Sequence, residues 1–185
     1  EQQMGGLDIL VNNAGIAGPT AAIEDITLDD WNRCLDVNLT GTFLCTRGAV
    51  PGMKQRRHGS IVNIGSVASR LAFPRRSPYS ATKYGVIGLT ETWATELGPH
   101  QIRVNAVLPG IVEGPRQDRV LNASAEAAGV SMEEMRQRVL QRVSLRSMVS
   151  ADDIAAAVVF LCSGAGASIT GQSLSVDGNV ETLVR

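Results

Sequence analysis

The sequence predicts an α/β protein in which a parallel β-sheet is covered by helices on both faces. Short apolar runs at residues 7–11, 60–64 and 102–108 have the nearly continuous hydrophobicity of strands that are buried on both sides. Long stretches with helical character separate these runs, and a last short strand is expected at Ser173–Val176. Strands that alternate with long helices pair in parallel, so the sequence predicts a doubly wound sheet.

The first long helix is expected over residues 29–57. Thr27 followed by Asp30 has the pattern of a helix N-cap, and Asp29 and Asp30 suit the positive end of the helix dipole. Gly59 is expected to end this helix. A spacing of four residues predicts one buried face, formed by Trp31, Leu35, Leu39 and Phe43.

The second half of the chain contains a further long helix and two shorter ones. Residues 78–97 begin at a proline and end before a Gly-Pro pair, as helices often do. Residues 110–129 are small and polar and are expected to be irregular. Ser131 is expected to cap a charged helix that runs to about residue 143, and Ser150 an apolar helix that runs to residue 162.

Charge and hydropathy exclude several kinds of partner. The net charge of -1 provides no field of one sign that would attract nucleic acid or a membrane surface. Two short basic runs, at residues 54–58 and 75–76, lack interleaved aromatic residues and are expected to be solvated. No apolar run approaches the roughly 18 residues of a membrane span, and no signal peptide is recognisable.

The three cysteines are odd in number and lie in apolar helical patterns. Cys34, Cys45 and Cys162 therefore suit a reducing cytoplasm and small core positions better than disulfides. Their spacing is not that of metal ligands, so no metal is expected. The sequence contains no internal repeat and predicts a single domain over residues 1–185.

Candidate functional residues follow the predicted strands, where ligands of parallel sheets bind. Asn12, Asn13, Ala14 and Gly15 follow the first strand; they are either an ordinary turn or a place where a flat ligand approaches the backbone. Ser66 follows the second strand, where a serine most often caps a turn.

Tyr79 and Lys83 are four residues apart, which places them on one face of their helix. Such a pair by itself is usually a surface contact, but with Ser66 and residues 12–15 in register it suits acid/base chemistry. A free phenol has a pKa of about 10 and would need to approach about 7, which corresponds to ~4 kcal/mol of preferential stabilisation of the phenolate. A fixed ammonium nearby can supply much of this.

Asn38 lies within the first long helix, where asparagine is a mediocre helix former. One interpretation is an ordinary polar residue that faces solvent. The other is a residue that disturbs the helix locally and ties water or the lysine into a proton relay. The residue pattern by itself leaves both open.

Taken together, these segments resemble the ordered signature of the short-chain dehydrogenase/reductase family, and the likeness covers essentially the whole chain. The segments are residues 12–15, Asn38 within Val-Asn-Leu-Thr-Gly, Ser66, Tyr79-Ser-Ala-Thr-Lys83, Pro109-Gly110 and Asp177-Gly178. The resemblance implies a Rossmann-type sheet and reversible hydride transfer between NAD or NADP and a ketone or secondary alcohol.

The resemblance also assigns roles to individual residues. It implies that Tyr79 is the general acid/base, that Lys83 lowers its pKa and binds the nicotinamide ribose, that Ser66 orients the substrate oxygen and that Asn38 supports the relay. Cofactor contacts are implied on the adenine-ribose side for Asn12, Ala14 and Gly15, and at the nicotinamide end for Pro109, Gly110 and Ile111.

The chain departs from the family pattern in two respects. The glycine-rich turn that holds the pyrophosphate in this family does not occur in the 185 residues, so we expect a truncated or partly recorded chain that lacks the first strands. The alternative is a non-catalytic remnant that serves as an oligomerisation or binding module. Gly114 also stands where relatives often have a threonine that contacts the cofactor.

Within the family, the general resemblance is to 3-oxoacyl-carrier-protein reductases and to sugar or polyol dehydrogenases. Residues 110–146 correspond to the segment that shapes the substrate pocket, where Glu113, Arg116 and Arg119 either face a polar substrate or are solvated. The two long helices resemble the pair through which the family forms homodimers and homotetramers. Phe43, Trp93 and Leu97 lie either at such an interface or in the core.

Overall fold

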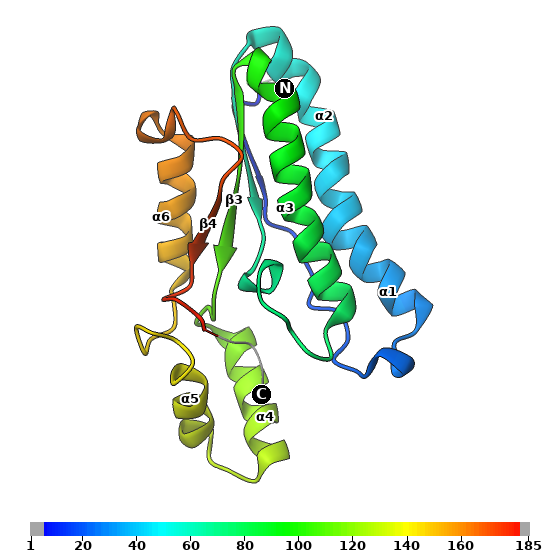
Figure 1. Ribbon diagram of the computed structural model, residues 1–185, viewed down its shortest axis with the longest axis vertical. Helices are drawn as coiled ribbons and strands as arrows, with labels where there is room; N and C mark the ends of the chain where they lie inside the picture. The colour runs from blue at the N-terminus through cyan, green and yellow to red at the C-terminus, as the bar shows by residue number, and fades with distance from the viewer. Residues whose placement is uncertain (1–5, 182–185) are drawn as a thin grey trace.

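The computed structural model describes residues 6–181, whose strands and helices alternate along the chain (Figure 1). The strands are β1 (Ile9–Asn12), β2 (Gly59–Ile64), β3 (Ile102–Pro109) and β4 (Ser173–Val176). The α-helices are α1 (Leu28–Leu35), α2 (Gly41–Arg56), α3 (Ser77–Leu97), α4 (Pro115–Ala128), α5 (Met132–Leu140) and α6 (Ala151–Cys162). Between α1 and α2 lies a π-helical turn, Asp36–Thr40, and the short 3₁₀ segment Val67–Ser69 follows β2.

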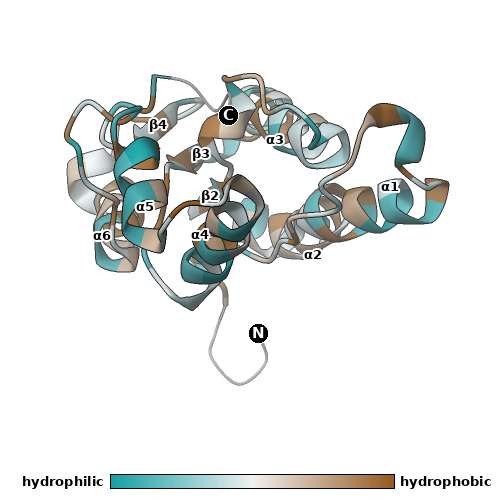
Figure 2. Ribbon diagram, turned by 90° about the horizontal axis from the view of Figure 1, so that it is seen from below, coloured by the Kyte–Doolittle hydropathy of each residue, from teal (hydrophilic) through white to brown (hydrophobic). Residues whose placement is uncertain are grey.

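The four strands form one parallel sheet in the order β1-β2-β3-β4. In register, Ile9 pairs with Ser60, Gly59 with Ile102 and Ala106 with Ser173. Helices α2 and α3 cover one face and α6 covers the other, and α4 and α5 lie beyond the carboxyl ends of the strands (Figures 1 and 2). The predicted doubly wound parallel α/β sheet is therefore confirmed.

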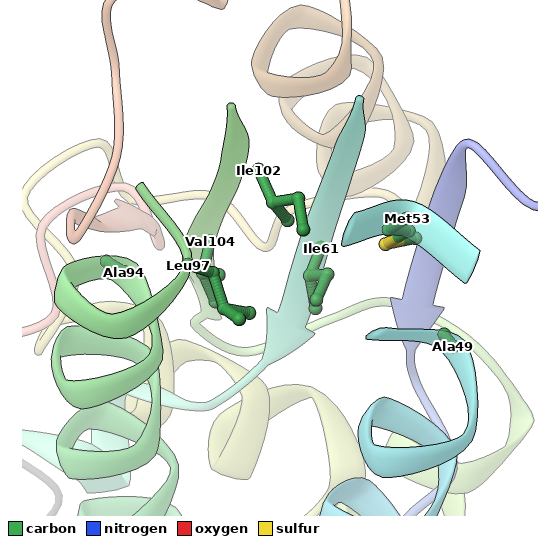
Figure 3. Packing of buried hydrophobic residues seen from close by; sticks show 7 residues of the cluster. All are labelled: Ala49, Met53, Ile61, Ala94, Leu97, Ile102 and Val104. Atoms are coloured by element: carbon green, nitrogen blue, oxygen red, sulfur yellow. The ribbon is translucent and has the colours of Figure 1, made fainter. Parts of the chain in front are cut away.

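The core between the sheet and the α2–α3 pair is built of aliphatic residues from four elements (Figure 3): Ala49, Met53, Ile61, Ala94, Leu97, Ile102 and Val104. A Cβ on Gly59 would lie 2.7 Å from Sδ of Met53, so the glycine at the start of β2 lets α2 approach closely. Leu97 is buried in this cluster and Trp93 packs against it. For these two residues the intramolecular core was the correct alternative.

On the opposite face, α6 packs on Val62 and Val107 through Leu161 and several partly buried aliphatic residues. The predicted cap is present, because Oγ of Ser150 accepts a hydrogen bond from the Asp153 amide at 3.1 Å. At the other end of α6, Arg103 of β3 donates to main-chain carbonyls, including those of Gly166 at 2.9 Å and Cys162 at 3.4 Å. An arginine from the sheet thus occupies the negative end of the helix dipole.

The first long helix differs from the prediction in its buried face. The cap is as predicted, with the Asp30 amide donating to Oγ1 of Thr27 at 3.1 Å, but Phe43 is 43% exposed. The buried positions are instead Cys34, Asn38, Thr42, Thr46, Ala49 and Met53, all small or polar except Met53. The spacing of four is kept from Cys34 to Thr46, through the π-helical turn, but the buried face lies one position before the predicted one, so the predicted phase was wrong. Helix α2 ends at Arg56, close to the predicted end at residue 57. The residue that ends it is Arg57, with a left-handed φ of 53°, and not Gly59.

Strand β1 is less buried than predicted. Its inward face packs through Leu10 against the α2 core, whereas Ile9 and Val11 are 48% and 40% exposed. The reason lies in the order of the sheet: β1 is an outer strand of the four, and α6 packs on β2 and β3 at the other side.

The stretch expected to be irregular contains helix α4, so that prediction was wrong. Pro115 stands at the first helical position, and Leu121 and Ala125 are buried. Helix α5 has the predicted Ser131 cap, at 3.1 Å from the Glu134 amide, but ends at Leu140 rather than near residue 143. Among the described residues, no helix is long and apolar enough to cross a membrane.

Candidate active site

The carboxyl ends of β1, β2 and β3 bring the predicted residues to one edge of the sheet. Asn12 is the last residue of β1, Ser66 follows β2 by two residues, and Pro109 is the last residue of β3. Because the three strands are parallel and in register, their ends meet at the same edge.

Lys83 reaches this edge from α3. It is only 7% exposed, and its Nζ donates a hydrogen bond to the carbonyl of Ile64, the last residue of β2, at 2.8 Å. A Cβ on Gly15 would lie 3.8 Å from the same Nζ. The ammonium is therefore fixed between the end of β2 and the loop that follows β1.

Tyr79 lies one helical turn before Lys83 on the same side of α3. The Nζ atom of Lys83 is 5.6 Å from the centroid of the Tyr79 ring, which is half-buried. The ring of Phe73 meets that of Tyr79 edge to face, with centroids 6.4 Å apart and an interplanar angle of 77°. The ring therefore lies beside the fixed ammonium on the same side of α3.

Asn38 is buried in the middle of the π-helical turn and ties three elements together. Its Oδ1 accepts from the Ile16 amide at 2.8 Å, and its Nδ2 donates to the Ile16 carbonyl at 3.0 Å and to Oγ1 of Thr82 at 3.1 Å. Oδ1 of Asn38 is also within 3.3 Å of the position of a Cβ on Gly15. The interpretation of a solvent-facing residue was wrong, and the expected local disturbance of the helix is confirmed.

Ser66 caps the short 3₁₀ segment after β2, as a serine at a strand end commonly does. Its Oγ accepts a hydrogen bond from the Ala68 amide at 3.1 Å, while its own amide donates to Oγ of Ser69 at 3.3 Å. An oxygen that accepts from the backbone can still donate its hydrogen to a ligand.

Asn12 uses its side chain to join neighbouring elements. Its Nδ2 donates to Oδ1 of Asn63 on β2 at 2.8 Å and to Oγ1 of Thr46 on α2 at 3.1 Å. Asn63 in turn donates to Oγ1 of Thr90 on α3 at 3.0 Å. The amide at the end of β1 therefore fixes the neighbouring strand, whereas Ala14 and Gly15 beyond it are exposed.

The Pro109-Gly110-Ile111 turn is held against the end of β4. The Gly110 amide donates to the Val176 carbonyl at 3.0 Å, and a Cβ at Gly110 would lie 2.6 Å from Cα of Asp177. Ile111 packs against a small buried cluster around Val67. No side chain larger than hydrogen fits at Gly110 without moving the backbone of the next strand.

Gly114, the second departure from the family pattern, has a φ of 133° and directly precedes α4. That backbone conformation favours glycine, so a threonine would be strained here. Of the three polar residues considered for the substrate pocket, Glu113 and Arg119 are exposed, and the side chain of Arg116 lies outside the described part.

Sequence reasoning missed two features near this edge. Arg76, expected to be solvated, is half-buried, and its Cζ lies 5.5 Å from the centroid of the Tyr79 ring. An open cleft of about 670 Å³ also lies beside the end of β4, lined by residues before α6, by Asp153 and by residues 175–179. This cleft contains none of the predicted catalytic residues, and only Asp177-Gly178 in the sequence pointed to it. Among the described residues, no cluster of three or more His, Cys, Asp or Glu side chains could hold a metal.

Comparisons with known proteins agree with this arrangement. The profile of a family described as "Enoyl-(Acyl carrier protein) reductase" matches residues 1–180. The chain is 37% identical over 179 residues to the 3-oxoacyl-[acyl-carrier-protein] reductase FabG of Thermotoga maritima, covering 97% of this chain and 68% of that protein. It is also 38% identical over 184 residues to the inactive 2-(S)-hydroxypropyl-CoM dehydrogenase 2 of Xanthobacter autotrophicus, covering 99% of this chain and 77% of that protein.

Solved structures are similar over nearly the whole chain. The NAD+-bound xylitol dehydrogenase superposes with a TM-score of 0.89 at 31% identity, covering 96% of this chain and 70% of that one. Sorbitol-6-phosphate 2-dehydrogenase SrlD from Erwinia amylovora gives a TM-score of 0.91 at 32% identity, with the same two shares. ElxO with NADP bound gives 0.84 at 32% identity, covering 96% of this chain and 68% of that one.

Proposed function

The chain belongs to the short-chain dehydrogenase/reductase family, and we propose that it forms the catalytic part of an NAD(P)-dependent enzyme that interconverts a ketone and a secondary alcohol. In this proposal residues 1–185 are part of one Rossmann-type domain. The observation that carries the proposal is the buried ammonium of Lys83, held 2.8 Å from the Ile64 carbonyl and 5.6 Å from the Tyr79 ring.

The residues at the strand ends fit a dinucleotide. At Gly15 the bare backbone lies next to Nζ of Lys83 and Oδ1 of Asn38, in the space that a side chain would fill. Tyr79 and Lys83 would hold the nicotinamide ribose. The flanking contacts would come from Asn12, Ala14 and Gly15 on the adenosine side and from Pro109, Gly110 and Ile111 on the nicotinamide side. When bound, NAD(P) supplies the two-electron redox chemistry.

The proton chemistry belongs to the chain itself. Tyr79 gives its phenolic proton to the substrate oxygen during reduction and takes it back during oxidation. Lys83 stabilises the phenolate between these events, because its charge is fixed nearby and shielded from solvent. Ser66 donates a hydrogen bond to the same oxygen as negative charge develops on it.

Asn38 holds the loop and the helix together around this pair. Its amide fixes the main chain of Ile16 beside Gly15, and its bond to Thr82 links it to the turn of α3 between Tyr79 and Lys83. We assign Asn38 a role in the proton relay through this placement, as a residue that keeps the lysine and the loop in one geometry.

For the substrate, the names of the relatives favour a hydroxyl or keto group on an acyl chain or a polyol. The 3-oxoacyl-carrier-protein reductase and the two polyol dehydrogenases all act on a carbon that carries such a group, as their names state. The first panel should therefore contain 3-oxoacyl thioesters, 3-hydroxy acids and sugar alcohols.

The direct test compares the protein with its Tyr79→Phe and Tyr84→Phe variants on this panel, with NAD(H) and with NADP(H). Tyr84 is the only other tyrosine in the sequence, lies on the same helix and is 49% exposed, so it is a matched control. Loss of the phenolic proton at residue 79 should lower kcat/KM by about 10²–10⁴-fold, and the control should be unaffected. Equal turnover by both variants would refute the assignment of Tyr79.

A second candidate is a non-catalytic remnant that acts as an oligomerisation or binding module. One observation favours it: a relative, the 2-(S)-hydroxypropyl-CoM dehydrogenase 2 of Xanthobacter autotrophicus, is named as inactive. Calorimetric titration of the protein with NAD and NADP separates the two candidates. Binding of either dinucleotide that is weakened by Lys83→Met would exclude the remnant.

The proposal also includes a homodimeric or homotetrameric assembly and a cytoplasmic location. Helix α2 exposes Phe43 and Leu44, which suits the face through which a homodimer or homotetramer would form. All three cysteines are free thiols, as expected for a cytoplasmic protein. Sedimentation velocity of the protein and of a Phe43→Glu variant would test the interface, since a buried charge there should dissociate the assembly.

A further inference from the structure

Arg76 lies against the ring of the proposed acid/base residue. It is the residue directly before α3, and its Cζ is 5.5 Å from the centroid of the Tyr79 ring and 5.3 Å from that of Phe73. Because the two rings meet edge to face, the guanidinium and Phe73 together limit how the Tyr79 ring can turn.

The same guanidinium is bonded to the loop that follows β1. Its Nη1 donates to Oγ1 of Thr20 at 2.6 Å, and its Nη2 donates to the Ala17 carbonyl at 2.9 Å. The neighbouring backbone adds a further link, since the Ala21 amide donates to the Arg75 carbonyl at 3.0 Å. Arg76 therefore connects the Tyr79 ring to the chain segment that begins at Gly15.

Two cations thus lie at similar distances from one phenol. The Nζ atom of Lys83 is 5.6 Å and the Cζ atom of Arg76 is 5.5 Å from the centroid of the Tyr79 ring. Lys83 follows Tyr79 on α3, and Arg76 precedes the helix. From α1, the thiol of Cys34 is a further titratable group in the field of both cations. Burial raises the pKa of that thiol, and a hydrogen bond with Thr82 and the charges of Arg76 and Lys83 oppose the rise.

We propose that Arg76 is a second positioning residue for Tyr79: it orients the phenol ring, and its charge favours the phenolate over the phenol. The charge effect follows from the distance, because a cation within a few ångströms of a partly desolvated group favours the anionic form. The orienting effect follows from the fork of hydrogen bonds to Thr20 and Ala17, which a lysine could not form in the same way. This inference adds a residue to the proposed function, and it matters for catalysis only if Tyr79 is the acid/base residue, as proposed above.

The test uses titration of the phenol rather than turnover. The chain has two tyrosines, so in a Tyr84→Phe background the near-ultraviolet absorbance of tyrosinate reports Tyr79 alone. Neutralising Arg76, as Arg76→Gln or Arg76→Met, should move the midpoint of that titration upward by about one pH unit. Arg76→Lys keeps the charge and should move it much less.

Arg75→Gln is the matched control, because Arg75 is the adjacent residue, carries the same charge and is exposed. Its titration midpoint should stay within about 0.2 unit of the parent. Equal midpoints for Arg76→Gln and Arg75→Gln would overturn the inference. So would a protein in which both neutral Arg76 variants fail to fold while Arg76→Lys folds, because the charge would then serve the fold and not the phenol.

The outcome is separable from that of the proposed function. A shifted midpoint in a protein that turns over no carbonyl or alcohol would uphold the role of Arg76 and refute the enzyme. Normal turnover by the parent protein, with an unchanged titration midpoint in Arg76→Gln, would uphold the enzyme and refute the role of Arg76.

Discussion

Asn38 binds the main chain of Ile16 with both halves of its side-chain amide. The oxygen accepts from the Ile16 amide at 2.8 Å, and the nitrogen donates to the Ile16 carbonyl at 3.0 Å. This pair of bonds joins the π-helical turn to the loop after β1, and it requires one donor and one acceptor at fixed positions.

Asn38→Asp should therefore be costly although it changes a single atom. A carboxylate would face the Ile16 carbonyl without a hydrogen to donate, in a site that is 2% exposed. We expect a loss of about 3 kcal/mol in the free energy of unfolding at neutral pH, measured by urea denaturation. Asn32→Asp on the exposed side of α1 is the control and should cost less than about 0.5 kcal/mol. Similar losses at both positions would contradict the role of this amide.

Cys34 should make the stability of the fold depend on alkaline pH. Burial raises the pKa of its thiol above the usual 9.0, so the thiol ionises more easily in the unfolded chain than in the folded one. This contribution to stability is complete below pH 9.0 and is lost as the pH rises from there through the folded pKa.

The measurement compares the parent with Cys34→Ala by urea denaturation at several pH values on either side of 9.0. The difference in unfolding free energy between the two should shrink at the alkaline end. Cys45→Ala, at an exposed site on α2, should give a difference that does not change with pH. Parallel stability curves for Cys34→Ala and the parent would show that ionisation of this thiol is not coupled to folding.

Arg103→Met should loosen the end of α6. The guanidinium donates to the carbonyls of Leu161, Cys162, Gly166 and Ile169, which would otherwise lack these partners. We expect a loss of about 2 kcal/mol in unfolding free energy, together with faster amide exchange at residues 159–166. Arg57→Met removes one exposed bond, to the Pro99 carbonyl at 3.1 Å, and should cost much less. Equal effects of the two substitutions would mean that the cap on α6 adds little.

Two glycine-to-alanine substitutions should have opposite signs. Gly110→Ala places a Cβ 2.6 Å from Cα of Asp177 and should destabilise the protein by about 2 kcal/mol, because the backbone after β4 must move. Gly88→Ala lies in the interior of α3, where a Cβ meets no atom within 4 Å, and should stabilise it by up to about 1 kcal/mol. Thermal denaturation of both variants checks the pair, and a stabilising Gly110→Ala would be incompatible with the close packing at that turn.

The elements that could be predicted from the sequence are those whose signals are local. The caps at Thr27, Ser131 and Ser150 are formed by neighbouring residues, and β4 has the predicted bounds. Helix α4 was missed because most of its residues are small or polar. Its two buried apolar positions, Leu121 and Ala125, give too weak a helical pattern to be recognised in the sequence.

At the candidate site, the spacing of Tyr79 and Lys83 predicted one shared helical face, and Lys83 does reach the end of β2 from there. Arg76 could not be found in the same way. Its contacts join residues before α3 to the loop after β1, about 56 positions earlier in the chain, and a basic pair in a loop has the same pattern whether its side chains are solvated or packed on a ring.

The π-helical turn Asp36–Thr40 has a consequence for which changes of length the protein can accept. A π-helical turn holds about one residue more than an α-helical turn, so it absorbs the roughly 100° of rotation that one residue adds in an α-helix. Deleting one residue within this turn would therefore leave an ordinary α-helix with Thr46, Ala49 and Met53 still facing the strands. Deleting one residue from α2 itself would rotate the rest of that helix by about 100° and turn the buried side chains after the deletion away from the sheet.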